Sequence, residues 1–441
     1  MVGTTLDDYE WRYAARMSGM AASEIRALFA VASRPEVVSL AGGMPFTAAL
    51  DYTELARLVS EMLIERGASA MQYGSGRGEQ RLRDLICEVM SLESIAASTD
   101  EVIVTVGSQQ ALSLLAQVFL DPGDIVLAEG PSYVGALGAF AAAQAEVQHV
   151  PMDSDGLQPE ALAAHLDRLR RQGRHAKFVY LVPNFHNPAG VTLSEDRRDA
   201  IVDLAEQHDL LIVEDNPYGL LGFEQAPGSA LRSRNAKRVM YLGSFSKTIA
   251  AGMGIGWIVA PHAVREKLAL VTEAQVLCPS AFNQAIVTAY LERYPWQEQL
   301  KTFRELYRHR RDAMLTALSS RMPEGVSWNV PAGGFFVWLT LPKGIDSKVM
   351  LPRALAHNVA YVQGAGFYAD GQGRSQLRLS YCFPSPERIS EGIRRFSVAL
   401  EEEREVQAIF SSNRDTPLNE STITKPAAGR ARYSAPGPEV E

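Results

Sequence analysis

Short apolar runs alternate with helical stretches through the middle of the chain, and this alternation limits the possible folds more than any other feature. The apolar runs are rich in Val, Ile and Leu and lack a regular alternation with polar residues, which is typical of strands covered on both faces. They are Glu101–Val106, Ile125–Glu129, Lys177–Val182, Leu210–Glu214, Arg238–Leu242 and Trp257–Ala260. Helical stretches such as Gln109–Phe119 and Ser194–Gln207 separate them. This order predicts an α/β domain with a mostly parallel sheet.

The pattern changes on both sides of this domain. We assign residues 51–282 to the large α/β domain, and we expect residues 1–50 to join a smaller domain. From about Phe282, long charged helices lead to an apolar run and a last strand, so residues 283–410 predict a small α+β domain. Residues 411–441 hold four prolines and few large apolar side chains, which predicts a disordered tail.

Composition excludes several classes of protein. With 46% apolar and 21% charged residues, the chain is neither wholly disordered nor collagen-like nor a coiled coil. Its net charge of −8 disfavours nucleic acid or an anionic membrane as a partner. The longest uncharged stretch, Val102–Leu120, is too polar to span a membrane, and the N-terminus does not resemble a signal peptide. Cys87, Cys278 and Cys382 form no disulfide or metal pattern, so we expect a cytoplasmic protein without a metal.

A lysine between small hydroxyl residues follows one of the predicted strands. In the segment 243–248, Lys247 could form a Schiff base with an aldehyde cofactor, while Ser244 and Ser246 could donate hydrogen bonds to a phosphate. A solvated loop lysine is the simpler alternative for this segment taken alone.

Three other polar segments also follow predicted strands. Asp215 could pair with a protonated ring nitrogen, and Asn187 could donate to an oxygen on the same ring. Ser108 stands where a strand leads through a glycine into a helix, and helix N-termini bind phosphate. Taken singly, each has a simpler explanation. Asp215 could be a loop acid, Asn187 part of an ordinary turn, and Ser108 a helix cap.

Together, the four segments lie where open α/β sheets place their ligands, at the carboxyl ends of strands. Their order and spacing resemble those of fold-type I pyridoxal phosphate enzymes, and most closely the class I/II aminotransferases, in the branch of 2-aminoadipate and kynurenine aminotransferases. The resemblance covers roughly Tyr13 to Ala399 and includes Leu40–Pro45, Tyr73–Gly78 and Gln376–Ser380. It implies a large domain with a mostly parallel sheet, a smaller α+β domain, and pyridoxal 5′-phosphate as the cofactor.

The resemblance also implies how the cofactor is held. Lys247 would be the Schiff-base lysine and would move a proton at the substrate α-carbon, and Asp215 would pair with the pyridine nitrogen. Asn187 and Tyr218 would hold the phenolic oxygen of the ring, and Tyr133 would stack on its face. The expected phosphate ligands are Ser108, Gln109, Ser244 and Ser246.

For the substrate, the resemblance implies a bidentate pair between Arg378 and the α-carboxylate, with Asn187 nearby and the backbone of Gly43 approaching the same group. Tyr73 would reach the phosphate or substrate of the neighbouring subunit, which implies a homodimer with shared active sites. Without the resemblance, a surface ion pair, a turn and a core aromatic would be the simpler interpretations of Arg378, Gly43 and Tyr73.

One position departs from the family pattern. The family usually has an arginine on the phosphate seven residues after the lysine, where this chain has Gly254, and Ala251 replaces a proline. A phosphate without that arginine loses about 1.5–3 kcal/mol unless another group replaces it. Either a nearby arginine or additional backbone donors compensate, or the site is remodelled for altered chemistry.

The resulting hypothesis is an aminotransferase that moves an amino group from an amino acid to a 2-oxo acid by a ping-pong mechanism, in amino-acid metabolism or biosynthesis. Phe185, Phe335, Tyr13 and Met44 could line an apolar pocket or belong equally to the core; a pocket of this kind favours a bulky or hydrophobic substrate. The alternative is a related enzyme that performs elimination, decarboxylation or oxidative deamination in specialised amino-acid metabolism. A ligand-sensing regulator is disfavoured, because only about 50 residues precede the α/β domain and none forms a basic recognition helix.

Overall fold

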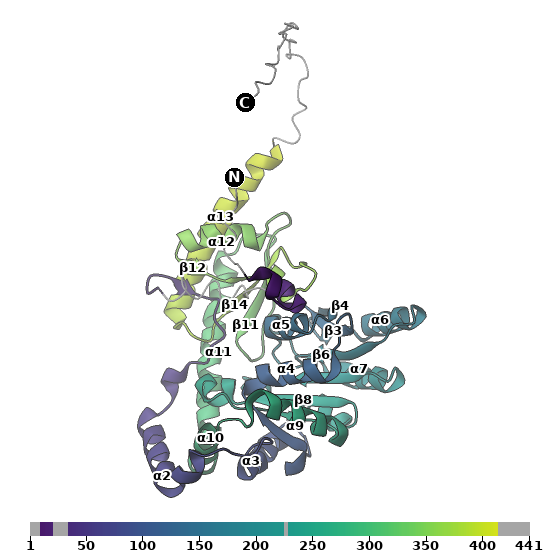
Figure 1. Cartoon of the computed structure of the whole chain (residues 1–441). Coiled ribbons are helices and arrows are strands. Elements are labelled where there is room, and N and C mark those ends of the chain that lie inside the picture. The colour runs from purple at the N-terminus through teal and green to yellow at the C-terminus, as the bar shows by residue number, and fades with distance from the viewer. Residues whose placement is uncertain (1–8, 21–33, 225–227, 413–441) are drawn as a thin grey trace, which may run out of the picture.

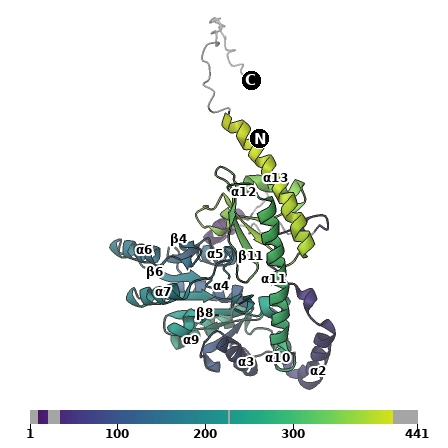
Figure 2. The same ribbon diagram turned by 180° about the vertical axis from the view of Figure 1, so that it is seen from behind.

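The computed structural model describes residues 9–20, 34–224 and 228–412, and Figures 1 and 2 show it from two sides. An eight-stranded sheet forms the centre, in the order β2-β9-β8-β7-β6-β3-β4-β5. Its strands are β2 (Val102–Thr105), β3 (Ile125–Gly130), β4 (Glu146–Asp153), β5 (Gly156–Leu157), β6 (Ala176–Leu181), β7 (Leu211–Asp215), β8 (Val239–Ser244) and β9 (Gly256–Val259). The neighbouring strands β4, β3, β6, β7 and β8 run parallel, whereas β2, β5 and β9 make antiparallel pairs. The predicted α/β class with a mostly parallel sheet is confirmed.

Helices cover both faces of this sheet, which explains the apolar strands. Val126 and Ala128 of β3 belong to the same core as residues of α4 and α5, while Ile125 and Leu127 pack in a second core with α6 and α7. Successive residues of one strand thus enter different cores. The helices around the sheet are α4 (Gly107–Phe119), α5 (Val134–Ala142), α6 (Pro159–Arg171), α7 (Glu195–Gln207), α8 (Leu231–Arg234) and α9 (His262–Val276).

A smaller antiparallel sheet lies beside the large one, in the order β10-β11-β14-β13. Its strands are β10 (Ser327–Trp328), β11 (Phe336–Thr340), β13 (Val362–Gln363) and β14 (Gln376–Ser380), with helices α11 (Trp296–Arg321), α12 (Ser347–Ala356) and α13 (Pro386–Ser412). The long α11 runs from α10 (Ala281–Arg293) beside the large sheet to α13 beside the small one (Figure 2).

The N-terminal part of the chain contacts both regions. Near its start, β1 (Val38–Ser39) pairs in parallel with β12 (Val359–Ala360), beside the small sheet. After it, α2 (Tyr52–Ala70) packs against α10 (Ala281–Arg293), with α3 (Gln80–Ser91) close by (Figure 1). The predicted domain limits stay a prediction, and the tail from 413 onward lies outside the described residues.

Short turns complete the described structure. They are the 3-10 turns Glu10–Arg12, Ala15–Gly19, Thr47–Ala49, Thr99–Glu101, Gly219–Leu221, Ala251–Met253 and Gly364–Phe367, and one π-helical turn, Ser246–Ala250. In the described ranges no helix combines the length and the apolar character that crossing a membrane requires. Cys87, Cys278 and Cys382 are free thiols.

Candidate active site

A cavity of about 430 Å³ opens at the carboxyl ends of the parallel strands, between the large sheet and the small one. It is lined by Gly43, Val106, Gly107, Ser108, Gln109, Tyr133, Val182, Asn187, Asp215, Pro217, Tyr218, Ser244, Ser246, Lys247, Ala251, Gly254, Phe336 and Arg378. Every catalytic, cofactor-binding and α-carboxylate-binding residue expected from the sequence is in this set except Tyr73. The segments that carry them are far apart in the chain, and the strand order brings them together.

Asp215, at the end of β7, provides a buried carboxylate with one oxygen still available. The hydroxyl of Tyr180 on the neighbouring β6 donates to Asp215 Oδ2 at 2.8 Å. Asp215 Oδ1 is buried and has no hydrogen-bond partner within the described residues. Burial raises the pKa of Asp215 to about 6, although the bond from Tyr180 lowers it. A cationic ring nitrogen would satisfy the free oxygen, so the carboxylate fits a pyridinium ring.

Lys247 lies in the π-helical turn that follows β8 directly. Its Nζ donates to the carbonyl of Gly43 at 3.0 Å. Burial lowers the pKa of Lys247, since the charged ammonium loses its hydration there. A lysine amine with a lowered pKa is more often neutral, which is the form that attacks an aldehyde.

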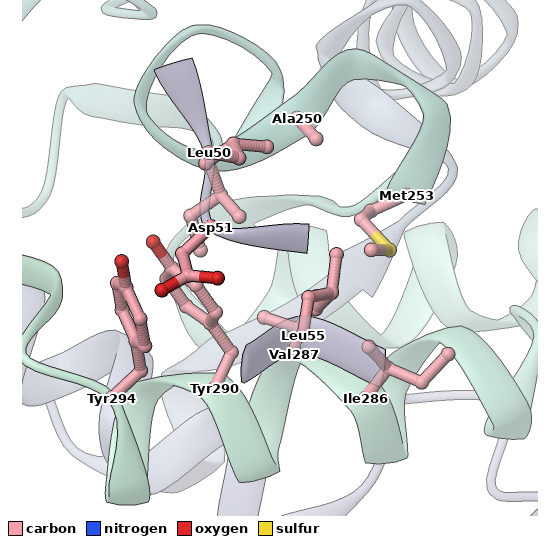
Figure 3. A pocket seen from close by; sticks show the side chains of 10 residues that line it. Leu50, Asp51, Leu55, Ala250, Met253, Ile286, Val287, Tyr290 and Tyr294 are labelled. Carbon is pink, nitrogen blue, oxygen red and sulfur yellow. The ribbon is translucent and has the colours of Figure 1, made fainter. Parts of the chain in front are cut away.

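The far side of this turn rests on apolar side chains from other elements (Figure 3). Ile249, Ala250 and Met253 line a small cavity together with residues of α2, of α10 and of the segment before α2. Tyr290 of α10 is one of them, and its ring stacks on Tyr294 with centroids 4.8 Å apart. The cavity measures about 10 Å³, room for about one water at most. The turn that carries Lys247 is therefore closely packed against neighbouring apolar side chains.

Arg378 on β14 is a fully buried cation that faces the same cavity. Its Nη1 donates to Asn187 Oδ1 at 2.8 Å and its Nη2 to the carbonyl of Ala41 at 2.6 Å, while the guanidinium lies 4.2 Å from the ring centroid of Phe336. Burial lowers the pKa of Arg378 to about 10. Within the described residues, Arg378 Nε has no hydrogen-bond partner. A buried guanidinium with a free N–H donor fits a carboxylate ligand.

The contact between Arg378 and Asn187 also orients the Asn187 amide. Because the amide oxygen accepts from Arg378, the amide nitrogen remains as the donor for a ligand in the cavity. Tyr218 lies nearby, and its ring packs edge-on against Phe335 and Phe336. These contacts hold two side chains that face the same part of the cavity.

At the other end of the cavity, α4 begins at Gly107, so its first backbone N–H groups face the ligand space. Gly107 has a φ of +69°, and Gly256 packs so closely that a Cβ there would lie 2.6 Å from the carbonyl carbon of Gly107. Ser244 and Ser246 lie opposite, with hydroxyl oxygens 2.9 Å apart. No acidic side chain among the described residues lines this end, which fits a phosphate.

Gly254 lies in this anion-binding end with a left-handed backbone, φ +58°. An added Cβ would meet only Val106 Cγ1, at an ordinary 3.6 Å. Among the described residues that line the cavity, Lys247 and Arg378 are the only cations. The nearby arginine considered as a replacement is not among them, whereas the backbone donors of α4 are present.

The structure places several expected residues elsewhere. Tyr73 is 78% exposed and lines a separate open groove with Leu277 and Cys278. Phe185 packs on Gly333 and Gly334, since a Cβ on either glycine would come within 2.6 Å of it.

Of the two alternatives for Phe335, the structure shows the core, because its ring packs between Tyr218 and Tyr307. Tyr13 and Met44 are largely exposed and do not line the cavity either. Phe336, the first residue of β11, lines the cavity instead of its neighbour Phe335. Tyr180 was not predicted at all, although its position on the strand beside Asp215 was a usable signal.

No group of three or more His, Cys, Asp or Glu side chains in the described ranges could hold a metal ion. The polar groups of the cavity therefore suit an organic anion with a basic ring nitrogen: a free carboxylate oxygen, a partly buried amine, a buried guanidinium and a helix N-terminus.

Comparisons with known proteins agree with this chemistry. Residues 36–396 match the family described as "Aminotransferase class I and II". The chain is 41% identical to "Aromatic-amino-acid aminotransferase 1" of Thermococcus litoralis over 90% of its own length and 95% of that protein.

Two solved structures extend the likeness to three dimensions. A multiple substrate aminotransferase from Thermococcus profundus superposes with a TM-score of 0.86 at 38% identity, covering 91% of this chain and all of that one. An alpha-aminoadipate aminotransferase from Thermus thermophilus, complexed with N-(5′-phosphopyridoxyl)-L-leucine, gives 0.84 at 34% identity, with coverage of 91% and 100%.

Proposed function

Because this chain belongs to the class I and II aminotransferases, we propose that it moves the α-amino group of amino acids with bulky or hydrophobic side chains to a 2-oxo acid. Amino-acid transamination with pyridoxal phosphate follows from the family membership and the close relatives. The observation that carries the proposal is one cavity that holds the buried carboxylate of Asp215, the partly buried amine of Lys247 and the buried guanidinium of Arg378. The preference for bulky substrates is supported by Phe336 in the cavity wall and by the relative that is an aromatic-amino-acid aminotransferase.

When bound, pyridoxal phosphate supplies an aromatic ring that accepts electrons from the substrate α-carbon. Asp215 would keep the ring nitrogen protonated through its free oxygen. Asn187 and Tyr218 would bind the phenolic oxygen, and Tyr133 would stack on the ring. The phosphate would lie at the start of α4 and be bound by Ser108, Gln109, Ser244 and Ser246.

Lys247 would hold the cofactor covalently and, once released by the substrate, move a proton at the α-carbon. Its amine donates to the Gly43 carbonyl, so the two groups share one part of the cavity wall. Arg378 would bind the α-carboxylate with its buried guanidinium, and Gly43 would approach the same group through its backbone. Because the aromatic rings of Phe336 and Phe367 flank Arg378, its side chain has little freedom to move.

The reaction type can be tested with the amino acid alone. Holoenzyme given phenylalanine without a 2-oxo acid should convert its cofactor once to the aminated form and stop, and 2-oxoglutarate should restart turnover. Phenylalanine, leucine and kynurenine should exceed aspartate in kcat/KM by at least about tenfold, because burying their apolar side chains against an apolar wall lowers the free energy of the bound state. Sustained release of ammonia, carbon dioxide or peroxide without the 2-oxo acid would contradict transamination and favour the lyase or oxidative deaminase.

We also propose a homodimer whose sites share residues. Tyr73, Leu270 and Leu277 are large apolar side chains that the single chain leaves exposed. Mixing Lys247→Ala subunits with Tyr73→Phe subunits should restore activity, because each mixed dimer has one site with both native residues. About a quarter of all sites would then be intact. A fully active monomer, or mixtures no more active than the separate variants, would contradict shared sites.

Gly254→Arg should slow the release of pyridoxal phosphate by several-fold, and by about 30-fold at most. A charged hydrogen bond to the phosphate is worth about 1.5–3 kcal/mol, and a side chain on this left-handed backbone costs about 1–2 kcal/mol. The measurement is the rate of cofactor transfer to an apoprotein trap, with Gly254→Ala as the control that adds strain without charge. Unchanged release in Gly254→Arg would mean that another group already compensates.

A cytoplasmic location and a role in amino-acid metabolism or biosynthesis complete the proposal. The free state of Cys87, Cys278 and Cys382 supports a reducing compartment. Fractionation of the native organism would test the location, and recovery of the enzyme outside the cytoplasm would contradict it.

A further inference from the structure

Tyr180 is a fully buried residue that contacts the carboxylate of Asp215 from the neighbouring strand. It pairs in register with Val213 of β7, so Asp215, two residues further on, lies on the same face of the sheet. The Tyr180 hydroxyl lies 2.8 Å from Asp215 Oδ2, and the two side chains are 0% and 2% exposed. Asp215 Oδ1 has no partner within the described residues. One oxygen is thus occupied by the protein, and the other is left for the cavity.

The Tyr180 ring is fixed by its neighbours. It packs edge-on against Phe140 of α5 with centroids 5.6 Å apart, and Phe140 packs in turn against Phe178. An ionised carboxylate can only accept hydrogen bonds, so the Tyr180 hydroxyl is the donor. A donor held in place stabilises the ionised carboxylate more than the neutral acid. The bond from Tyr180 accordingly lowers the pKa of Asp215, against the effect of burial.

We propose that Tyr180 is a positioning residue for transamination, which turns the Asp215 carboxylate so that Oδ1 meets the cofactor ring nitrogen and keeps that carboxylate ionised. The proposal rests on the proposed pairing of Asp215 with the ring nitrogen. Without the Tyr180 hydroxyl, the carboxylate would be free to rotate and would compete more strongly for the shared proton. The ring nitrogen would then be less protonated, and the ring would accept electrons less well.

The test compares Tyr180→Phe with Tyr361→Phe in holoenzyme loaded with cofactor carrying ¹⁵N in the ring. Tyr361 is a matched control, because it is also fully buried and donates its hydroxyl to a backbone carbonyl, that of Ser347, at 2.6 Å. In Tyr180→Phe the ¹⁵N signal should move toward the unprotonated ring. The value of kcat should fall about tenfold while KM stays within about twofold. Tyr361→Phe should leave the ¹⁵N signal and kcat unchanged.

An unchanged ¹⁵N signal in Tyr180→Phe overturns the proposal, whether or not kcat falls, because a loss of kcat alone would indicate only a packing role. If Tyr180→Phe does not fold, 4-aminophenylalanine at position 180 keeps the shape with a weaker donor and should give a smaller shift in the same direction. Asp215→Asn separates the two hypotheses. If Asp215→Asn also leaves the ¹⁵N signal unchanged, the role of Asp215 itself fails. If only Asp215→Asn moves the signal, the inference about Tyr180 alone fails.

Discussion

Lys247→Ala is expected to lower the rate of transamination by about 10³-fold or more, and to abolish trapping of the cofactor by borohydride. Both effects follow from removing one partly buried amine, which would bind the cofactor covalently and move the proton at the α-carbon. The rate is measured with saturating phenylalanine and 2-oxoglutarate. The trapped adduct is found by mass spectrometry of the reduced and digested protein.

Lys237→Ala is the matched control, because Lys237 is an exposed lysine outside the cavity. Its rate and its borohydride adduct should equal those of the native enzyme. Detection of the cofactor on a lysine other than Lys247 in the native enzyme would show that the site has been assigned incorrectly.

Asp215→Asn is expected to lower kcat by about 100-fold, since it keeps the shape of the side chain and removes the charge opposite the ring nitrogen. The native carboxylate should show a characteristic dependence on pH. Burial raises the pKa of Asp215 to about 6, so the group is ionised above that pH and neutral below it. The affinity of the apoenzyme for pyridoxal phosphate should therefore fall as the pH drops through about 6, and Asp215→Asn should lose this step.

The measurement is a fluorescence titration of apoenzyme with cofactor from pH 5 to pH 8 at constant ionic strength. Asp209→Asn, at an exposed aspartate, is the control and should retain the native profile. A native affinity that does not change across this range would contradict the ionised carboxylate as the partner of the ring.

The strands with both faces covered could be predicted from the sequence, because continuous runs of Val, Ile and Leu mark them. Strand β4 was missed, since Gln148, His149 and Pro151 interrupt its apolar residues on a partly exposed strand next to β5. The antiparallel direction of β9 could not be predicted from composition either. It follows from the short turn after β8, which leaves no room for the crossover that a parallel strand needs.

For the site, motifs at strand ends were sufficient to bring most cavity residues together. Individual aromatic residues were not predictable, because Phe335 and Phe336 are neighbours at the start of β11 and only Phe336 lines the cavity. Tyr180 depends on the register between β6 and β7, and that register is set by packing on both faces of the sheet rather than by any local motif.

The two hydrogen bonds of Arg378 have a consequence for how the chain unfolds. Its guanidinium extends from the small sheet to Asn187, which follows a strand of the large sheet, and to Ala41, which follows β1. If either sheet moved away, a positive charge would be left in an apolar setting without acceptors, at a cost of several kcal/mol. The two sheets are thus coupled by this side chain as well as by the apolar cluster to which strands of both sheets contribute. A ligand carboxylate bound at Arg378 would strengthen this coupling. The free energy of unfolding should therefore rise as the site is occupied.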